Sequence, residues 1–99
     1  MDPDMTDFSI ADVVISLAGR HQGKLFYVID VNGTYLLLVN GKDRTVEKPK
    51  KKKCKHAQKV LRSETRVAEK LRAGDKVLNS ELRRDLAAIG REMQVTSGG

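Results

Sequence analysis

Two apolar segments, residues 24–31 and 34–40, flank an Asn32-Gly33 pair, and this arrangement limits the folds open to the chain. Asn-Gly between such segments is the strongest short signal for a β-hairpin with a type I′ turn. Alternate residues of a strand point to opposite faces. In the first strand, one face would carry Leu25, Tyr27 and Ile29, and the other Phe26 and Val28. Because both faces are apolar, the strands must either bend into a small closed barrel or receive a cover on the second face.

Further strands are expected on both sides of this hairpin. β-Branched residues favour a strand at 13–17. The sequence NGKDR at 40–44 predicts a turn, followed by a short strand near 45–48 that Pro49 would interrupt, since proline has no N–H to donate to a sheet. A fifth strand is expected within 54–60. The predicted fold class is therefore mainly β, with five short strands.

The last third of the chain predicts two helices that could cover the sheet. Ser63 is a candidate N-cap for a helix over 64–72 that ends at Gly74. Asn79 or Ser80 is a candidate N-cap for a second helix that ends near residue 89 or 93. An apolar stripe at helical spacing is formed by Leu78, Leu82, Leu86, Ile89 and Met93. We expect this stripe to pack against the strands or against a partner.

A chain of 99 residues has the length of one domain, or of one small domain with an appendage. The expected division is a disordered N-terminus at 1–8, a β-domain at 9–61, a helical extension at 62–93 and a disordered tail at 94–99.

Basic residues are concentrated in one part of the chain. Residues 42–59 contain nine Lys or Arg against Asp43 and Glu47, giving +7, whereas residues 1–41 carry −3 and residues 60–99 carry +2. Such clustering is typical of a surface that binds a polyanion. The acidic start MDPDMTDFS does not have the pattern of a signal peptide, and the apolar runs are too short to cross a bilayer. A cytoplasmic protein with no membrane partner is therefore expected.

The segment between the first two predicted strands is longer than a hairpin needs. Gly19 and Gly23 permit backbone angles that a Cβ would hinder, and Arg20 and His21 lie between them. A loop of this kind could hold a phosphate through backbone N–H groups and a guanidinium. The alternative is a surface turn whose glycines serve geometry alone and whose charges are solvated.

The sequence DVVISLAGRHQGKLFYVIDV, with Gly23 as the central glycine, resembles a KOW motif. The continuation YLLLVNGKDRTVEKPKKKKCKH extends this likeness to residues 10–60. The combination resembles bacterial KOW-domain RNA-binding proteins that are similar to large-subunit ribosomal proteins of the L-fourteen-e-like group. For the segment after residue 62 the similarity is only to the variable helical tail of such proteins.

This resemblance implies an SH3-like barrel of five strands whose loops at one end contact RNA or protein. Carried over by position, the loop residues implied to bind RNA are Arg20, His21, Gln22, Gly23 and Lys24. A second implied contact zone contains Lys42 and Arg44. These loops contain no aromatic residue, unlike domains that stack bases, so the sequence gives no support for base-specific recognition.

A lysine-rich segment follows at 48–56, and charge repulsion means that folding alone gains nothing from it. Its candidate RNA-binding residues are Lys48, Lys50, Lys51, Lys52, Lys53, Lys55 and His56. Lysine is a flexible point charge with little base selectivity, so these residues would supply affinity for phosphates and the loops would supply orientation. RNA is the expected partner, with ribosomal RNA in a ribosome-associated particle as the target class. The alternatives are a solvated basic loop that only aids solubility and a localisation-like patch.

No catalytic, metal or cofactor signature stands out. Cys54 and His56 are too few for a zinc site, and a single cysteine cannot form an internal disulfide. Neighbouring lysines could lower the pKa of Cys54 and leave the thiol open to oxidation. The expectation is a non-enzymatic protein without cofactors. The alternative to RNA binding is a protein-interaction module that docks a transcription or ribosomal protein.

Overall fold

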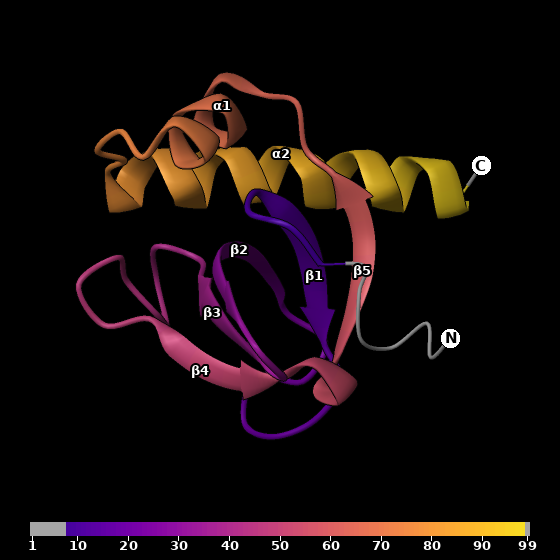
Figure 1. Ribbon diagram of the computed structural model, residues 1–99. Coiled ribbons are helices and arrows are strands. Elements are labelled where there is room, and N and C mark those ends of the chain that lie inside the picture. Colours follow the sequence, from indigo (N-terminus) through magenta and orange to yellow (C-terminus); the bar gives the residue numbers. More distant parts are fainter. Residues whose placement is uncertain (1–7, 99) are drawn as a thin grey trace.

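The computed structural model describes residues 8–98, with side chains described as far as Met93. Its elements are β1 (Asp12–Ser16), β2 (Leu25–Asn32), β3 (Tyr35–Val39), β4 (Lys50–Lys53), the 3₁₀ turn η2 (Cys54–His56), β5 (Ala57–Arg62), α1 (Arg66–Ala73) and α2 (Asn79–Gly98) (Figure 1). The expected disordered N-terminus lies outside the described residues except for Phe8, which packs against the sheet. None of the helices in 8–98 has the length and apolarity needed to cross a membrane.

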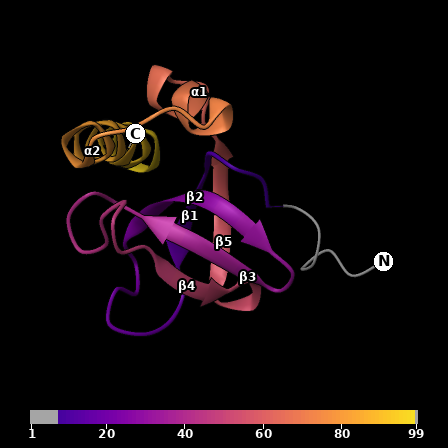
Figure 2. The same ribbon diagram turned by 60° about the vertical axis from the view of Figure 1, so that its left-hand side comes forward.

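The five strands form one antiparallel sheet in the order β4-β3-β2-β1-β5, so β4 and β5 are its edges. The strand register shifts between Val13 and Val14 and again between Val28 and Asp30. Such bulges bend strands and increase their twist. The sheet is accordingly bent (Figures 1 and 2), but no pairing joins β4 to β5 among the described strands, so no closed barrel forms.

The two apolar faces of the sheet are both buried, each by a different means. Tyr27 and Val39 belong to a cluster that the helices cover with Val67, Leu82 and other side chains. On the opposite face, a second cluster lies within the bend of the sheet. It contains Val14, Phe26, Val28, Leu36, Leu38, Cys54 and Ala57. The predicted division of side chains between the faces of β2 is thus confirmed. The helices bury one face of the sheet, and the bend of the sheet buries the other.

The hairpin between β2 and β3 differs from the predicted type I′ turn. Asn32 pairs with Tyr35, so the two loop residues are Gly33 and Thr34. Gly33 has φ 65°. Thr34 does not have a positive φ, since Ala11 is the one non-glycine residue of the described chain that does. A glycine with positive φ at the first loop position is the pattern of a type II′ turn. Cys54 donates its N–H to Thr34 O over 2.8 Å, which fixes the turn against η2.

The predicted strand near 45–48 is wrong, and the strand lies in the lysines that follow. Lys48 N–H donates to Thr45 O in a turn, and Val46 N–H donates to Asn79 Oδ1 on α2. These bonds direct the segment toward the helices and away from β3. β4 begins only after Pro49, where each lysine can pair with β3 through the main chain.

Both predicted helices exist, with shifted boundaries. Thr65, not Ser63, caps α1 by accepting a bond from Ala68 N–H, and Gly74 ends the helix with φ 78°. α2 starts at Asn79, and Glu81 accepts from the N–H of Leu78, the residue before the helix. It continues to Gly98, although the sequence predicts an end between 89 and 93 followed by a loose tail. Leu82, Leu86 and Ile89 of the predicted stripe are buried, but Leu78 is 53% exposed.

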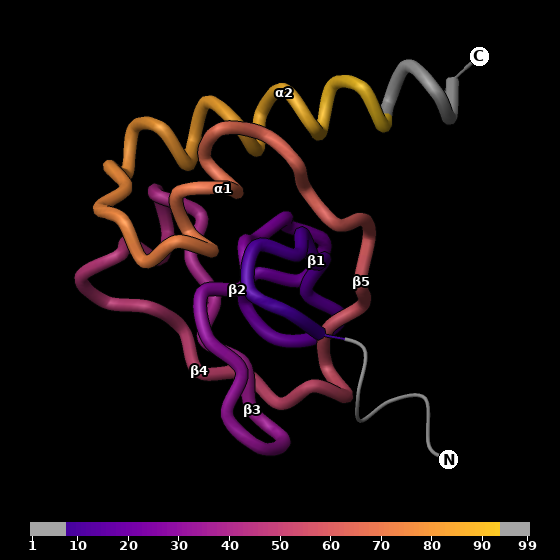
Figure 3. The backbone as a smooth tube through the Cα atoms, turned by 45° about the horizontal axis from the view of Figure 1, so that its top comes forward, coloured from indigo at the N-terminus to yellow at the C-terminus, as the bar shows by residue number. Residues whose placement is uncertain are grey.

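A buried cluster of hydroxyls around one carboxylate joins the helices to the sheet. Tyr27 on β2 donates its hydroxyl to Asp85 on α2 and lies 2.7 Å from Ser63 Oγ. Thr65 donates to the same Asp85 oxygen over 2.9 Å. Burial, and then the bond to Asp85, raise the pKa of Tyr27 to about 12. Figure 3 shows the chain passing from β5 over the sheet into α1 and along α2. Ser63 and Thr65 belong to the stretch between β5 and α1, so part of this cluster lies where the chain passes from the sheet to the helices.

Candidate nucleic-acid interface

The loop between β1 and β2 is closed by its own backbone. Gly23 N–H donates to Ser16 O over 2.8 Å, Gln22 N–H to Gly19 O over 3.2 Å, and Lys24 N–H to His21 O over 3.0 Å. Gly19 and Gly23 have φ 87° and 86°, which explains why glycine stands at both positions. The predicted phosphate grip by exposed amides therefore does not extend to residues 22–24. Arg20 and Gln22 are exposed and present their side chains to solvent.

His21, one of the loop residues implied to bind RNA, does not extend freely into solvent. Its ring is half-buried and meets the ring of Phe26 edge-on, with 6.0 Å between the centroids. Nδ1 has no hydrogen-bond partner among the described residues. Burial lowers the pKa of His21. The charge of Asp43 opposes this shift, whereas Lys24, Arg44 and Arg20 act in the same direction as burial. His21 therefore supports the loop as an uncharged ring more than it offers a cation to a ligand.

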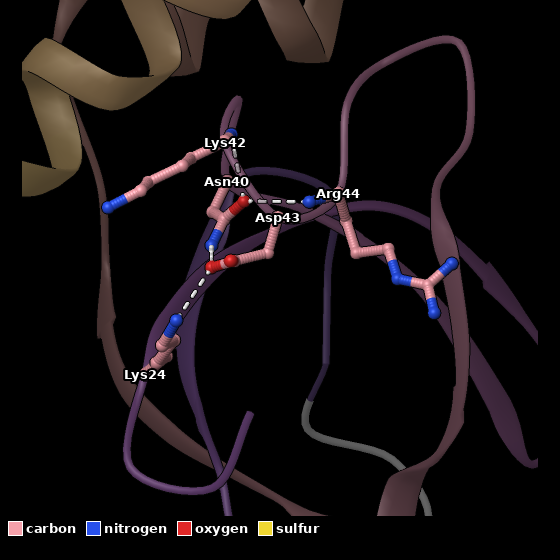
Figure 4. Close-up of polar contacts among 5 residues, drawn as sticks. All are labelled: Lys24, Asn40, Lys42, Asp43 and Arg44. Atoms are coloured by element: carbon pink, nitrogen blue, oxygen red, sulfur yellow. Dashed lines mark hydrogen bonds and ion pairs between the residues drawn. The ribbon is translucent and has the colours of Figure 1, made fainter. Parts of the chain in front are cut away.

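Asn40 organises the turn at 40–44, which Figure 4 shows in close-up. Its Oδ1 accepts the N–H groups of Lys42 and Arg44, each over 3.0 Å, and its Nδ2 donates to Asp43 Oδ2 over 3.0 Å. Lys24 donates to the same Asp43 oxygen over 3.0 Å. The bonds from Asn40 and Lys24 lower the pKa of Asp43, so this carboxylate stays charged. These bonds close the turn and link it to the β1–β2 loop.

The cations of this turn are oriented differently from one another. Lys24 is partly neutralised by Asp43, although its side chain remains 48% exposed. Lys42 and Arg44 point away from Asp43 in opposite directions (Figure 4). Lys42 is exposed and Arg44 is half-buried. Of the predicted residues in this part of the chain, Lys42 is thus the cation most open to a ligand.

Gly41, Asn79 and Arg83 fix this turn to α2, and none of them is among the site residues predicted from the sequence. Gly41 is buried with φ 78°, and a Cβ there would lie 2.2 Å from Asn79 O. Arg83 donates to Gly41 O over 2.7 Å. The Asn-Gly pair at 40–41 was a usable signal for a tight turn, but its contact with a helix some forty residues away has no local signature.

The four lysines of β4 alternate between two environments. Their partners on β3 are, in order, Leu38, Leu37, Leu36 and Tyr35. Lys50 and Lys52 pair with the buried leucines and are half-buried, while Lys51 and Lys53 are exposed. Lys51 Nζ lies 4.4 Å from the ring centroid of Tyr35, a cation–π contact that orients the ammonium without neutralising it.

Lys52 is a structural residue in this arrangement. Its Nζ donates to Ala18 O over 2.7 Å and to Ser16 Oγ over 3.0 Å. Burial lowers the pKa of Lys52, and the charge of Lys50 does so further. These bonds tie β4 to the β1–β2 loop. Lys52 therefore uses its ammonium group within the fold, and its contact with RNA stays a prediction.

The end of the lysine segment forms η2 and not a strand. Lys48 and Lys55 are exposed, and His56 is half-buried with its carbonyl accepting Leu17 N–H over 2.9 Å. Cys54 is buried, and burial raises the pKa of its thiol. The prediction that nearby lysines lower this pKa is wrong, because the thiol points into the apolar cluster within the sheet.

Three basic segments that are separate in sequence therefore meet. Lys52 joins β4 to the β1–β2 loop, and Lys24 with Asp43 joins that loop to the 40–44 turn. Figures 1 and 2 place β4 and the β1–β2 loop on the side of the molecule away from the helices. We call these three segments, residues 17–24, 40–44 and 50–53, the basic surface. Its exposed cations are Arg20, Lys24, Lys42, Lys51 and Lys53.

Comparison with models of known protein families gives no match to this chain, and no curated protein sequence matches it. The likeness to a KOW motif accordingly rests only on the sequence of residues 10–60.

Proposed function

We propose that this protein binds RNA, with ribosomal RNA as the target class, and catalyses no reaction. The proposal rests on two hydrogen bonds. Lys52 joins β4 to the β1–β2 loop, and Lys24 joins that loop to Asp43 in the 40–44 turn. Cations drawn together by folding repel one another, and a row of phosphates would relieve that repulsion. The KOW-like sequence at 10–60 and the bent sheet support an SH3-like architecture for the domain.

Phosphate contacts would supply most of the affinity. Lys51 and Lys53 project from a strand, and Arg20 and Lys42 project from two ordered turns, so their spacing is set by the fold. An RNA helix displays phosphates and 2′-hydroxyls across a shallow minor groove and is recognised largely by shape. The surface has Tyr35 beside Lys51, but no aromatic residue in either loop. We therefore propose recognition of backbone shape with little base preference.

The test is the salt dependence of binding to an RNA hairpin, measured by fluorescence anisotropy. Removing one lysine that neutralises a phosphate should reduce the slope of log K against log salt by roughly 0.7–0.9. We expect the variant K51Q/K53Q to lose about 1.5 from this slope and at least tenfold in affinity at moderate salt.

The matched control is R66Q/K76Q, which removes the same charge from exposed residues of α1 and of the segment before α2. It should bind as the wild type does. Equal losses in the two variants would indicate a non-specific charge effect and would contradict the proposal. A protein partner whose capture survives K51Q/K53Q, in the absence of RNA binding, would contradict it as well.

The target class is tested in cells. Crosslinking followed by sequencing of the attached RNA should enrich one region of ribosomal RNA. Background RNA alone would reject ribosomal RNA as the target.

A further inference from the structure

A shallow hollow of about 310 Å³ lies where the 40–44 turn meets α2, next to the basic surface. Three parts of the chain line it, and they come together only because α2 packs on the sheet. The lining residues are Lys24, Leu25, Asn40, Lys42, Asp43, Arg83, Leu86 and Ala87. The volume is at the small end of the roughly 300–1,000 Å³ found for ligand pockets, so it suits one planar group.

The walls of the hollow divide into an apolar floor and a charged rim. Ala87 is exposed and Leu25 is half-buried, and these two supply most of the accessible aliphatic surface, with the buried Leu86 beneath them. Lys24, Lys42 and Arg83 supply three cations against the single carboxylate of Asp43. A phosphate alone would make no apolar contact with the floor, and an apolar ligand would form no ion pair with the rim.

The donors of the rim are not all engaged. Arg83 uses Nη1 for Gly41 O, which leaves the rest of its guanidinium group to face a ligand. The side chain of Lys42 has no partner among the described residues and extends away from Asp43 (Figure 4). Asn40 and Asp43, in contrast, are occupied by bonds to each other, to Lys24 and to the backbone of the turn.

We propose that this hollow binds a single unpaired nucleotide of the RNA. The base would lie on Leu25, Leu86 and Ala87, and its phosphate would lie between Lys42 and Arg83. Because Asn40 and Asp43 are already bonded, little remains to read the base edge, so the subsite would distinguish unpaired from paired bases without strong base preference. This inference rests on the proposed function and adds a role for α2 in it.

The test uses two RNA hairpins that differ by one bulged nucleotide. The wild-type protein should bind the bulged hairpin about tenfold more tightly than the fully paired one. Ala87→Leu should abolish this preference, because the larger side chain occupies the floor while keeping helix propensity and charge. Ala73→Leu, at an exposed position of α1, is the matched control and should keep the preference.

A second variant and a direct readout make the result independent of the folding of Ala87→Leu. Lys42→Gln should also reduce the preference for the bulge, by about threefold or more. 2-Aminopurine at the bulge should change its fluorescence on binding to the wild type and not to Ala87→Leu.

Equal binding of both hairpins by the wild type, or a preference that both variants retain, would overturn the subsite alone. No binding of either hairpin would overturn the proposed function and the subsite with it.

Discussion

At the scale of the residue, lysines that are adjacent in sequence have different tasks. Lys51 and Lys53 face solvent, while Lys52 donates to Ala18 O and Ser16 Oγ beneath the strand. A strand predicted at 45–48 gives no reason to distinguish these lysines from one another. Had the strand been placed at 50–53, its twofold alternation would have predicted this division.

Lys52→Met should destabilise the protein and leave RNA contacts largely intact. It keeps the aliphatic stem but removes the charged donor to Ala18 O and Ser16 Oγ, which then keep their bond to each other. This loss should cost about 1–2 kcal/mol of unfolding free energy. Lys53→Met, its neighbour on the exposed face, should change stability by less than about 0.5 kcal/mol. Urea denaturation followed by circular dichroism measures both. A larger loss for Lys53→Met would show that the roles are reversed.

Tyr27 should make stability fall at high pH. The phenol has a pKa of 10.0 when unperturbed and about 12 in the fold. Between these values the unfolded chain has lost this proton and the folded chain has kept it, so the unfolding free energy decreases as pH rises. The decrease due to Tyr27 should be on the order of 2–3 kcal/mol over this interval.

The contribution of Tyr27 is isolated by comparing denaturation at several pH values in the wild type and in Tyr27→Phe. The variant should show a shallower decline, since Phe has no proton to lose. Parallel declines would mean that other groups cause the loss of stability.

At the scale of the element, the 40–44 turn depends on a helix distant in sequence. Gly41 lies against Asn79 at the start of α2, and Asn79 also accepts from Val46 N–H and donates to Glu47. This set of contacts explains why 45–48 leaves the sheet. Local propensity predicted the turn, the hairpin region and both helices. It could not predict the contacts between these elements or the shift of the α1 cap from Ser63 to Thr65.

Gly41→Ala should be one of the most damaging single-methyl changes in the chain. The new Cβ would lie 2.2 Å from a backbone oxygen and would sit on a residue with φ 78°, so we expect a loss of about 3 kcal/mol or more. Gly33→Ala is the control, with φ 65° and no atom within 4 Å of its Cβ, and should cost about 1 kcal/mol. Thermal and chemical denaturation would compare them. Similar costs would show that the clash with Asn79 is relieved easily.

At the scale of the whole molecule, the helices and the sheet form one unit with two buried clusters. The two apolar faces of the strands predict either a bent sheet or a cover on the second face, and the protein has both a bent sheet and covering helices. The sequence also located the basic residues, but not the two ties that bring three basic segments together, because those bonds join residues 19 and 34 positions apart. Such contacts follow from the register of the sheet and cannot be read from composition.

We propose that these three segments act as one surface for RNA. The most direct measurement is an NMR titration of the isotope-labelled protein with an RNA hairpin. We expect the amide signals of 17–24, 40–44 and 50–53 to shift together with one dissociation constant, while those of α1 stay in place. Shifts confined to one segment, or different constants for the three segments, would contradict it.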